Sequence, residues 1–215
     1  MKDKRQPFYI YMDIEGVGPL VSIHSMLSWA ACVVTPEPYT KLGLEKRGFV
    51  FYDELAPISG EYEIEAMRIG CLGLRCLDLY KSAPEFDARS LQFNPALVLE
   101  VLRNKGTEPT AAMAKLREWL AKVVPDGFRP ELVTDTVIFD ASHINYYLSA
   151  FGGDNLFGHS GLDINSYCRG FFQSRSASLK TLGIVDDRLV PHCAEDDAIF
   201  GSKLARELLF NRSKP

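Results

Sequence analysis

The chain has 215 residues, of which 47% are hydrophobic and 24% are charged, and its formal net charge is −4. These values fit one globular domain without disorder, and the mild acidity argues against a long duplex nucleic acid as partner. No run approaches 18 consecutive apolar residues and the charged N-terminus lacks a secretory pattern, so we expect a cytoplasmic protein with no membrane span. The five cysteines have no C-x-x-C spacing, which favours free thiols.

The N-terminal part predicts one strand that ends in two acidic residues. Residues 8–14 are aromatic and β-branched, as in strands. Asp13 and Glu15 lie two positions apart, so on a continuing strand both project to the same face. Gly16 follows and would let a ligand approach the backbone closely. By itself, this pair also fits two exposed acids before a turn.

Two further strands are predicted over residues 21–34 and 47–55, and together with the first they would form an antiparallel meander. Prolines and glycines interrupt residues 56–94, so no element is predicted there. Residues 96–104 predict a short helix.

Residues 110–124 predict a longer helix with an apolar stripe at three-four spacing, which indicates core packing. We expect Thr107 to cap this helix and Pro125 to end it.

A second acidic site follows in the middle of the chain. Residues 132–139 predict a strand and residues 141–151 a helix, which places Asp140 at a strand-to-helix junction. Such a position also suits an ordinary helix N-cap. Asp135 is the competing acid within the predicted strand. We favour Asp140 because the junction lies at the edge of the sheet.

The third site is the stretch from His192 to Leu209. A histidine ends a loop, and a helix with one apolar face begins near Asp196. The helix dipole favours the acidic residues of the first turn, so Asp196 is interpreted as a helix-end acid. Alone, the stretch also fits a capped surface helix.

Carboxylates on three separate segments, together with a histidine, indicate hydrolysis of a phosphodiester. Two hard cations about 3.5–4 Å apart stabilise the attacking and leaving oxygens in such reactions. Mg²⁺ and similar ions take oxygen ligands, which aspartate and glutamate supply. A histidine outside the metal shell can accept the proton of the attacking water.

The three sites resemble the motifs of the DEDDh branch of the DnaQ-like 3′–5′ exonucleases, within the ribonuclease H-like superfamily. The first motif matches at Asp13-Ile14-Glu15, and the second matches over residues 137–140. The third, H-x-A-x-x-D-A, matches over residues 192–198 and is the most specific. All three occur in the family's order, and the resemblance spans roughly residues 8–209.

The resemblance implies an α/β ribonuclease H-like fold, with a central mixed β-sheet flanked by α-helices. It implies a single exonuclease domain over residues 1–215, in which residues of about 56–94 would be an insertion. The implied activity is 3′–5′ exonucleolytic hydrolysis with two Mg²⁺ or Mn²⁺ ions, releasing nucleoside 5′-monophosphates. The implied metal ligands are four carboxylates: Asp13, Glu15, Asp140 and Asp197.

His192 would be the general base. The backbone at Gly16 and a small apolar wedge at Val17 would line the 3′-terminal nucleotide, and His143 is a weaker candidate for a substrate contact. Many family members carry threonine after the first motif's glutamate. This chain has Gly16 there, so the threonine hydroxyl contacts would be lost.

Several alternatives stay open. A non-catalytic module that binds nucleic acid or a protein partner could use the same fold. Among enzymes, single-stranded DNA and RNA 3′ ends are both open as substrates, and resemblance to RNA-acting relatives implies a homodimer. Basic residues such as Lys180 and Arg188 could hold phosphates, although solvated surface charge is the favoured interpretation.

Overall fold

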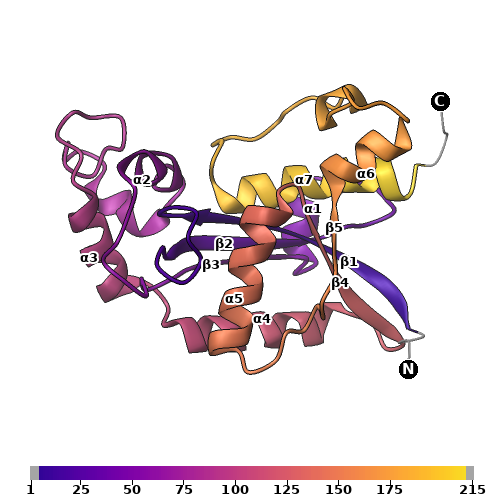
Figure 1. The fold of residues 1–215 in the computed structure, drawn as a ribbon, viewed down its shortest axis with the longest axis horizontal. Helices are drawn as coiled ribbons and strands as arrows, with labels where there is room; N and C mark the ends of the chain where they lie inside the picture. Colours follow the sequence, from indigo (N-terminus) through magenta and orange to yellow (C-terminus); the bar gives the residue numbers. More distant parts are fainter. Residues whose placement is uncertain (1–4, 212–215) are drawn as a thin grey trace.

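The structure is a computed structural model, and it describes residues 5–211. Within this range the strands form one mixed sheet in the order β3-β2-β1-β4-β5 (Figure 1). β1 pairs antiparallel with β2 and parallel with β4, and it therefore lies at the centre of the sheet. The strands are β1 Gln6–Gly16, β2 Met26–Val33, β3 Val50–Glu54, β4 Phe128–Thr134 and β5 Gly161–Asp163.

Helices flank the sheet, which confirms the predicted fold class. The α-helices are α1 Lys41–Lys46, α2 Ile64–Gly70, α3 Pro95–Lys105, α4 Pro109–Val123, α5 Ser142–Phe151, α6 Ile164–Phe171 and α7 Ala194–Leu209. Two short 3₁₀ helices, η1 Arg75–Tyr80 and η3 Leu179–Leu182, and a π-helical segment, η2 Val137–Ala141, lie between them. No helix within residues 5–211 is both long and apolar enough to cross a membrane.

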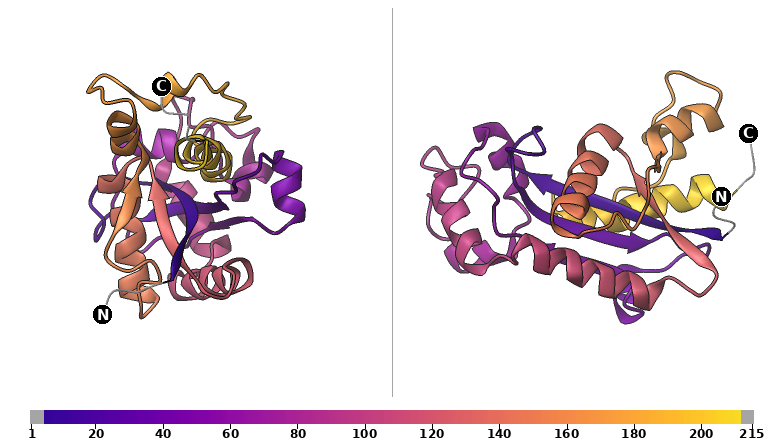
Figure 2. Two further views of the ribbon diagram at one scale, coloured as in Figure 1. Left: turned by 90° about the vertical axis from the view of Figure 1, so that its right-hand side faces the viewer. Right: turned by 60° about the horizontal axis from the view of Figure 1, so that its bottom comes forward.

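The alternation of side chains along β1 divides the core into two layers. Ile10, Met12 and Ile14 pack against α4 and α5 on one face. Tyr11 faces the opposite side, where α6 and α7 cover the sheet. α4 and α7 accordingly lie on opposite faces (Figures 1 and 2). A strand buried on both faces in this way fixes its register strongly.

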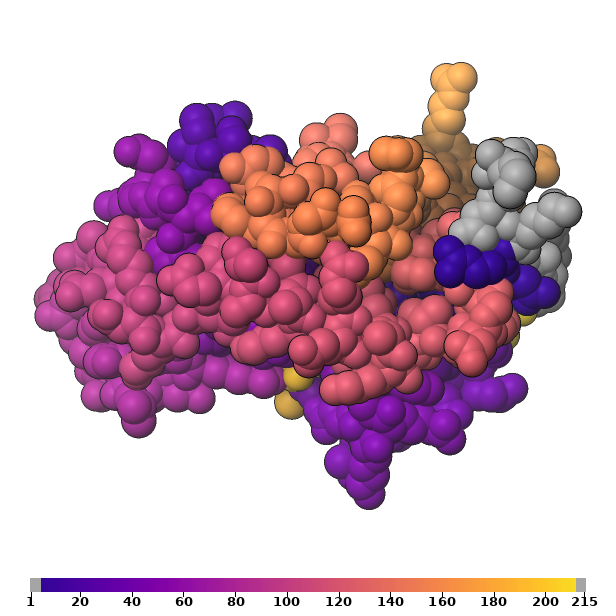
Figure 3. All heavy atoms as spheres, turned by 90° about the horizontal axis from the view of Figure 1, so that it is seen from below, coloured from indigo at the N-terminus to yellow at the C-terminus, as the bar shows by residue number. Residues whose placement is uncertain are grey.

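Residues 56–94 contain α2 and η1, and they pack with α3 into a third apolar cluster at one end of the sheet (Figure 1). Val17 and Leu27 join this cluster, so it is continuous with the loop that follows β1. Seen from below, the side chains of α3 and α4 form a continuous band across the molecule (Figure 3). Whether residues 56–94 are an insertion stays a prediction.

The first strand and the three-stranded meander are confirmed, but the second strand is shorter than predicted. It begins at Met26 and not at residue 21. The preceding residues form a turn, in which the backbone N–H groups of Ile23 and His24 both donate to the carbonyl oxygen of Leu20. The β-branched residues at 21 and 23 therefore belong to a loop, because this local turn satisfies the backbone that a strand pairing would have used.

The strand predicted over residues 132–139 is also wrong at its C-terminal end. β4 ends at Thr134, and the next residues form the π-helical segment that leads into α5. Ile138 is 89% exposed, so this β-branched residue does not belong to a buried strand. Asp140 thus lies inside a wide helical turn and not at a strand end. Such π-helical turns are frequent at functional sites.

The predicted cap of α4 is a third correction. α4 begins at Pro109 with Glu108 before it, and no side chain caps it. Thr107 instead extends the sheet, since its N–H donates to the carbonyl oxygen of Glu54 and its hydroxyl donates to Asp53 at 2.9 Å. The apolar stripe of α4 is buried as predicted.

Candidate active site

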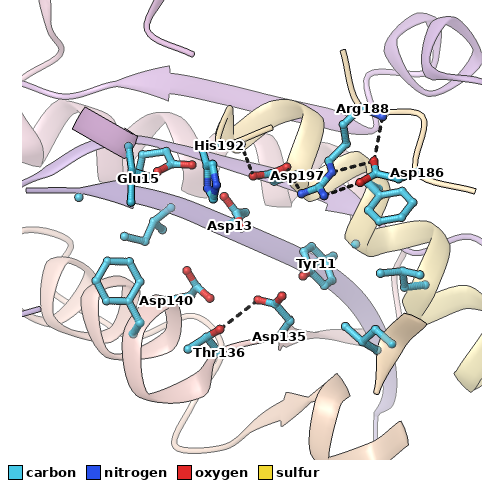
Figure 4. A pocket seen from close by; sticks show the side chains of 18 of the residues that line it. Tyr11, Asp13, Glu15, Asp135, Thr136, Asp140, Asp186, Arg188, His192 and Asp197 are labelled. Carbon is cyan, nitrogen blue, oxygen red and sulfur yellow. Dashed lines mark hydrogen bonds and ion pairs between the residues drawn. The ribbon is translucent and has the colours of Figure 1, made fainter. Parts of the chain in front are cut away.

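A cavity of about 750 Å³ opens where β1, η2 and the start of α7 meet (Figure 4). The three motif segments, which are far apart in the sequence, all reach its wall. The cavity is lined by Tyr11, Asp13, Ile14, Glu15, Gly16, Ala66, Ile69, Asp135, Thr136, Phe139, Asp140, Leu179, Lys180, Ile184, Asp186, Arg188, His192, Asp197, Phe200, Gly201 and Leu204.

β1 supplies Asp13 and Glu15 from its C-terminal end. Both side chains lie on the face that Tyr11 shares, as a period of two requires. The pairing with β2 shifts register between Glu15 and Gly16. A bulge of this kind ends regular pairing and re-aims the side chains next to it, and bulges are common beside active sites.

η2 supplies Asp140 from the opposite wall. Its backbone N–H donates to the carbonyl oxygen of Thr136 at 2.9 Å, and this bond ties Asp140 to the start of the segment. The side chain is only 4% exposed. Burial, with the nearby Asp135 carboxylate, raises the pKa of Asp140 to about 8.

The start of α7 supplies Asp197, and the preceding loop supplies His192. One Asp197 oxygen, Oδ2, accepts the backbone N–H of His192 at 3.0 Å, and the other, Oδ1, accepts Nη1 of Arg188 at 2.7 Å. His192 has a left-handed backbone with φ 62°, which is uncommon for a residue other than glycine. Its exposed ring lies beside Glu15 and Asp197 (Figure 4).

The neighbouring Asp196 lies outside the cavity. Its Oδ1 accepts Nζ of Lys41 at 2.8 Å, and its Oδ2 accepts the backbone N–H of Val190 at 3.0 Å. Glu195 also pairs with Lys41. The structure therefore separates the two adjacent aspartates: Asp197 lines the cavity, and Asp196 anchors the helix start to α1.

The electrostatics of the site favour a bound cation. Burial is the main cause that raises the pKa of Asp13 well above its usual range, and the charges of Asp140, Glu15 and Asp197 raise it further. Burial likewise raises the pKa of Glu15. Positive charge placed among such carboxylates would offset their mutual repulsion.

The donor atoms also suit a hard cation. Ligand atoms of Glu15, His192 and Asp197 all lie within 4.8 Å of one another, close enough to share one ion. Asp13 and Asp140 lie outside this tight group but line the same cavity. Carboxylate oxygens are the ligands that Mg²⁺ and Mn²⁺ prefer. The residues present therefore fit a divalent cation.

The sequence patterns gave no site role to Tyr11 or Asp186 and favoured a solvated charge for Arg188, yet all three line the cavity. Strand periodicity could have found Tyr11, because it precedes Asp13 by two positions and so shares its face. Asp135 had been considered only as a competitor of Asp140, yet both carboxylates line the cavity. No sequence signal places Asp186 and Arg188, since the loop that carries them has no periodicity.

The weaker substrate-contact candidates have different placements. Gly16 lines the cavity. Val17 is fully buried in the third apolar cluster and lies outside the cavity wall, so the expected wedge is not formed by its side chain. His143 is also fully buried, and its Nδ1 lies 3.1 Å from the carbonyl oxygen of Phe139. Neither side chain lines the cavity, and their contact with a nucleotide stays a prediction.

The fold is shared with several solved nucleases. The nuclease domain of 3′hExo, a DEDDh family member bound to rAMP, superposes with a TM-score of 0.66 at 14% identity, covering 99% of this chain and 96% of that chain. The nuclease CRN-4 superposes with a TM-score of 0.63 at 10% identity. The match covers 98% of this chain and 66% of CRN-4. Escherichia coli exonuclease I, in a complex with single-stranded DNA, superposes with a TM-score of 0.58 at 14% identity. The match covers 97% of this chain and 42% of exonuclease I. The fold is thus ribonuclease H-like.

Sequence similarity adds a curated relative. The chain is 32% identical over 158 residues to the 3′-5′ DNA exonuclease Cap18 of Escherichia coli. The alignment covers 74% of this chain and 66% of the relative, slightly less than two thirds of that protein's length. No protein-family model matches the sequence. The chain is thus similar in sequence to a 3′-5′ DNA exonuclease and shares the fold of a DEDDh nuclease domain.

Proposed function

We propose that this chain is a divalent-cation-dependent 3′–5′ exonuclease that releases nucleoside 5′-monophosphates from single-stranded 3′ ends. The observation that carries the proposal is the convergence of three motif segments on one cavity. Carboxylates from β1, η2 and α7 line it, and His192 lies beside them. A binding module would need neither the crowded carboxylates nor the adjacent histidine.

Each motif residue has a proposed role. Asp13, Glu15, Asp140 and Asp197 would hold two Mg²⁺ or Mn²⁺ ions, and the choice between the two metals is open. When bound, such cations stabilise the charge on the attacking and leaving oxygens of the phosphodiester. The backbone N–H of His192 donates to Asp197, which fixes the loop against the helix. The His192 ring would accept the proton of the attacking water.

The proposed first substrate is single-stranded DNA. The similar protein from Escherichia coli is named a DNA exonuclease, and exonuclease I was solved with single-stranded DNA. The 3′hExo domain was solved with rAMP, so RNA is the matched comparison.

The test compares 5′-labelled DNA and RNA oligonucleotides of one sequence, incubated with Mg²⁺, Mn²⁺ or EDTA. We expect stepwise shortening from the 3′ end and mononucleotide release only with a cation. Asp197→Asn should reduce the rate by more than about a hundredfold, because even outer-shell changes at metal sites cost 10–100-fold.

Asp196→Asn is the matched control, because it alters the adjacent carboxylate that faces Lys41 and not the cavity. It should stay within a few-fold of the unaltered protein. Full activity of Asp197→Asn would remove the metal assignment. Failure of the unaltered protein to shorten either polymer with either metal would favour the binding-module alternative.

A further inference from the structure

Arg188 is the cation that contacts the proposed metal ligands most directly. It lies in the loop between η3 and α7, where sequence reasoning favoured a solvated charge. Its side chain is only 26% exposed, and its Nη1 donates to Oδ1 of Asp197 at 2.7 Å. Arg188 therefore belongs to the cavity and not to the solvent (Figure 4).

Asp186 and Phe200 hold the guanidinium in place. Nε of Arg188 donates to Oδ1 of Asp186 at 2.9 Å, and Nη2 donates to Oδ2 at 2.6 Å, so the pair is bidentate. The Phe200 ring of α7 lies beneath the guanidinium, with 5.0 Å from Cζ to the ring centroid. A side chain fixed on two sides loses little conformational freedom when it binds a ligand.

Within residues 5–211, three hydrogen bonds of the Arg188 guanidinium to side chains are formed, which leaves two of its N–H groups for a ligand. Arginine has five N–H groups, and three of them donate to Asp186 and Asp197. The two others are carried by the terminal nitrogens Nη1 and Nη2 at the cavity wall. A pair of N–H groups on a planar guanidinium matches two oxygens of one phosphate.

The charge of the cavity makes such a group necessary. Its wall carries six carboxylates: Asp13, Glu15, Asp135, Asp140, Asp186 and Asp197. Among the described residues that line it, Lys180 and Arg188 are the only lysine or arginine, and Lys180 is exposed. A polyanionic strand entering this cavity needs positive charge near Asp197 beyond that of the metal ions alone.

We propose that Arg188, clamped by Asp186 and Phe200, is a phosphate-binding residue that contacts the 5′-phosphate of the 3′-terminal nucleotide beside the cation on Asp197. This inference rests on the proposed exonuclease function and adds a substrate-binding residue outside the three motifs. Asp186 is then a positioning residue, because it acts through Arg188.

The ion pair with Asp197 means that loss of Arg188 should affect phosphate binding and cation binding in different directions. A cation and the guanidinium are both attracted to Asp197 but repel each other. Replacing Arg188 with a neutral residue should therefore weaken phosphate binding and leave cation binding equal or tighter. A purely structural role would weaken both, because the site around Asp197 would lose its order.

The experiment is isothermal titration calorimetry with the full chain. Mn²⁺ is titrated first, and deoxyadenosine 5′-monophosphate and deoxyadenosine are then titrated at saturating Mn²⁺. For Arg188→Gln we expect a Kd for the monophosphate that is about tenfold higher or more, as loss of a charge-assisted hydrogen bond implies. The Kd for deoxyadenosine and the Kd for Mn²⁺ should not rise.

Two further variants sharpen the test. Arg188→Lys keeps the charge but not the bidentate geometry, so it should fall between Arg188→Gln and the unaltered protein, and it serves if Arg188→Gln does not fold. Arg175→Gln removes one positive charge from an exposed position outside the cavity and should bind all three ligands normally.

Unchanged monophosphate binding by both Arg188 variants would overturn the inference, and so would weaker Mn²⁺ binding by Arg188→Gln. The proposed function fails separately. If the unaltered protein shortens oligonucleotides with Mn²⁺ and Asp197→Asn does not, the function stands whatever the Arg188 variants do. If the unaltered protein shortens neither polymer, the function falls, and monophosphate binding that depends on Arg188 would then support a phosphate site without the activity.

Discussion

At the scale of single residues, the backbone of His192 and the carboxylate of Asp197 form one unit. The left-handed φ of 62° at His192 is held by its N–H bond to Asp197, so the loop conformation and the metal-ligand candidate depend on each other. Strained backbone of this kind tends to persist only where neighbouring contacts enforce it. The sequence predicted both residue types and their spacing, but only the structure reveals that the bond between them is made by the backbone of the histidine.

His192→Gln keeps this backbone bond while removing the proposed base. We expect the turnover rate to fall by about 10²–10⁴-fold, the usual contribution of general acid–base catalysis. The measurement is the rate of oligonucleotide shortening at saturating substrate, with Mn²⁺ affinity measured in parallel.

The control is His159→Gln, which changes an exposed histidine outside the cavity. A large loss of Mn²⁺ affinity in His192→Gln would contradict the general-base role, since His192 would then be a metal ligand beside Glu15 and Asp197.

At the scale of elements, the position of α7 against β1 decides the geometry of the site. α7 makes its broadest contacts with β1 and β2, and Gly201 allows its close approach. A Cβ atom at Gly201 would lie 2.0 Å from Cζ of the Tyr11 ring. Periodicity predicted the apolar face of α7, but it could not predict that a glycine on this face accommodates a cavity-lining tyrosine, because that depends on how two distant elements meet.

Gly201→Ala should push α7 away from β1 and disturb the site. Overpacking of this kind costs about 1–3 kcal/mol, and for a chain of this size each kcal/mol lowers the Tm by about 2–4 °C. Thermal unfolding measures the shift. Gly170→Ala is the matched control, because no atom lies within 4 Å of a Cβ atom placed there. Alanine in that helix should leave the Tm equal or raise it. Equal Tm values for the two variants would show that the contact with Tyr11 is not restrictive.

At the scale of the whole molecule, the acidic cavity lowers the stability of the fold, while the proposed function needs its carboxylates close together. The apolar layers on both faces of the sheet hold carboxylates together that repel one another. Functional sites often lower stability in this way. The expected homodimer stays a prediction, and sedimentation would measure it.

The raised pKa values imply how stability depends on pH when EDTA removes divalent cations. Asp140 has a pKa of about 8 in the folded protein, against an ordinary value near 4 when unfolded. Between these pH values the folded state holds a proton that the unfolded state has released, so the contribution of Asp140 to stability declines as pH rises. Asp140→Asn should therefore raise the Tm at pH 8 and flatten its dependence on pH.

Thermal unfolding in EDTA from pH 5 to 9 measures this difference between the variant and the unaltered protein. Asp126→Asn, at an exposed loop position, should leave the slope unchanged. A Tm of Asp140→Asn that stays equal to or below that of the unaltered protein at pH 8 would contradict the prediction.

The sequence by itself determined the central strand, the meander, the buried face of α4 and the order of the three motifs, because these follow from local periodicity and residue chemistry. It did not determine the turn before β2 or the π-helical turn that carries Asp140, since β-branched residues favour strands unless the surrounding backbone bonds override them. It gave no site role to Tyr11 or Asp186, and for Arg188 it favoured a solvated surface charge over a phosphate contact. Only the tertiary structure brings these residues to the cavity, because their proximity depends on the packing of α7 and its preceding loop against β1 and not on any pattern within one segment.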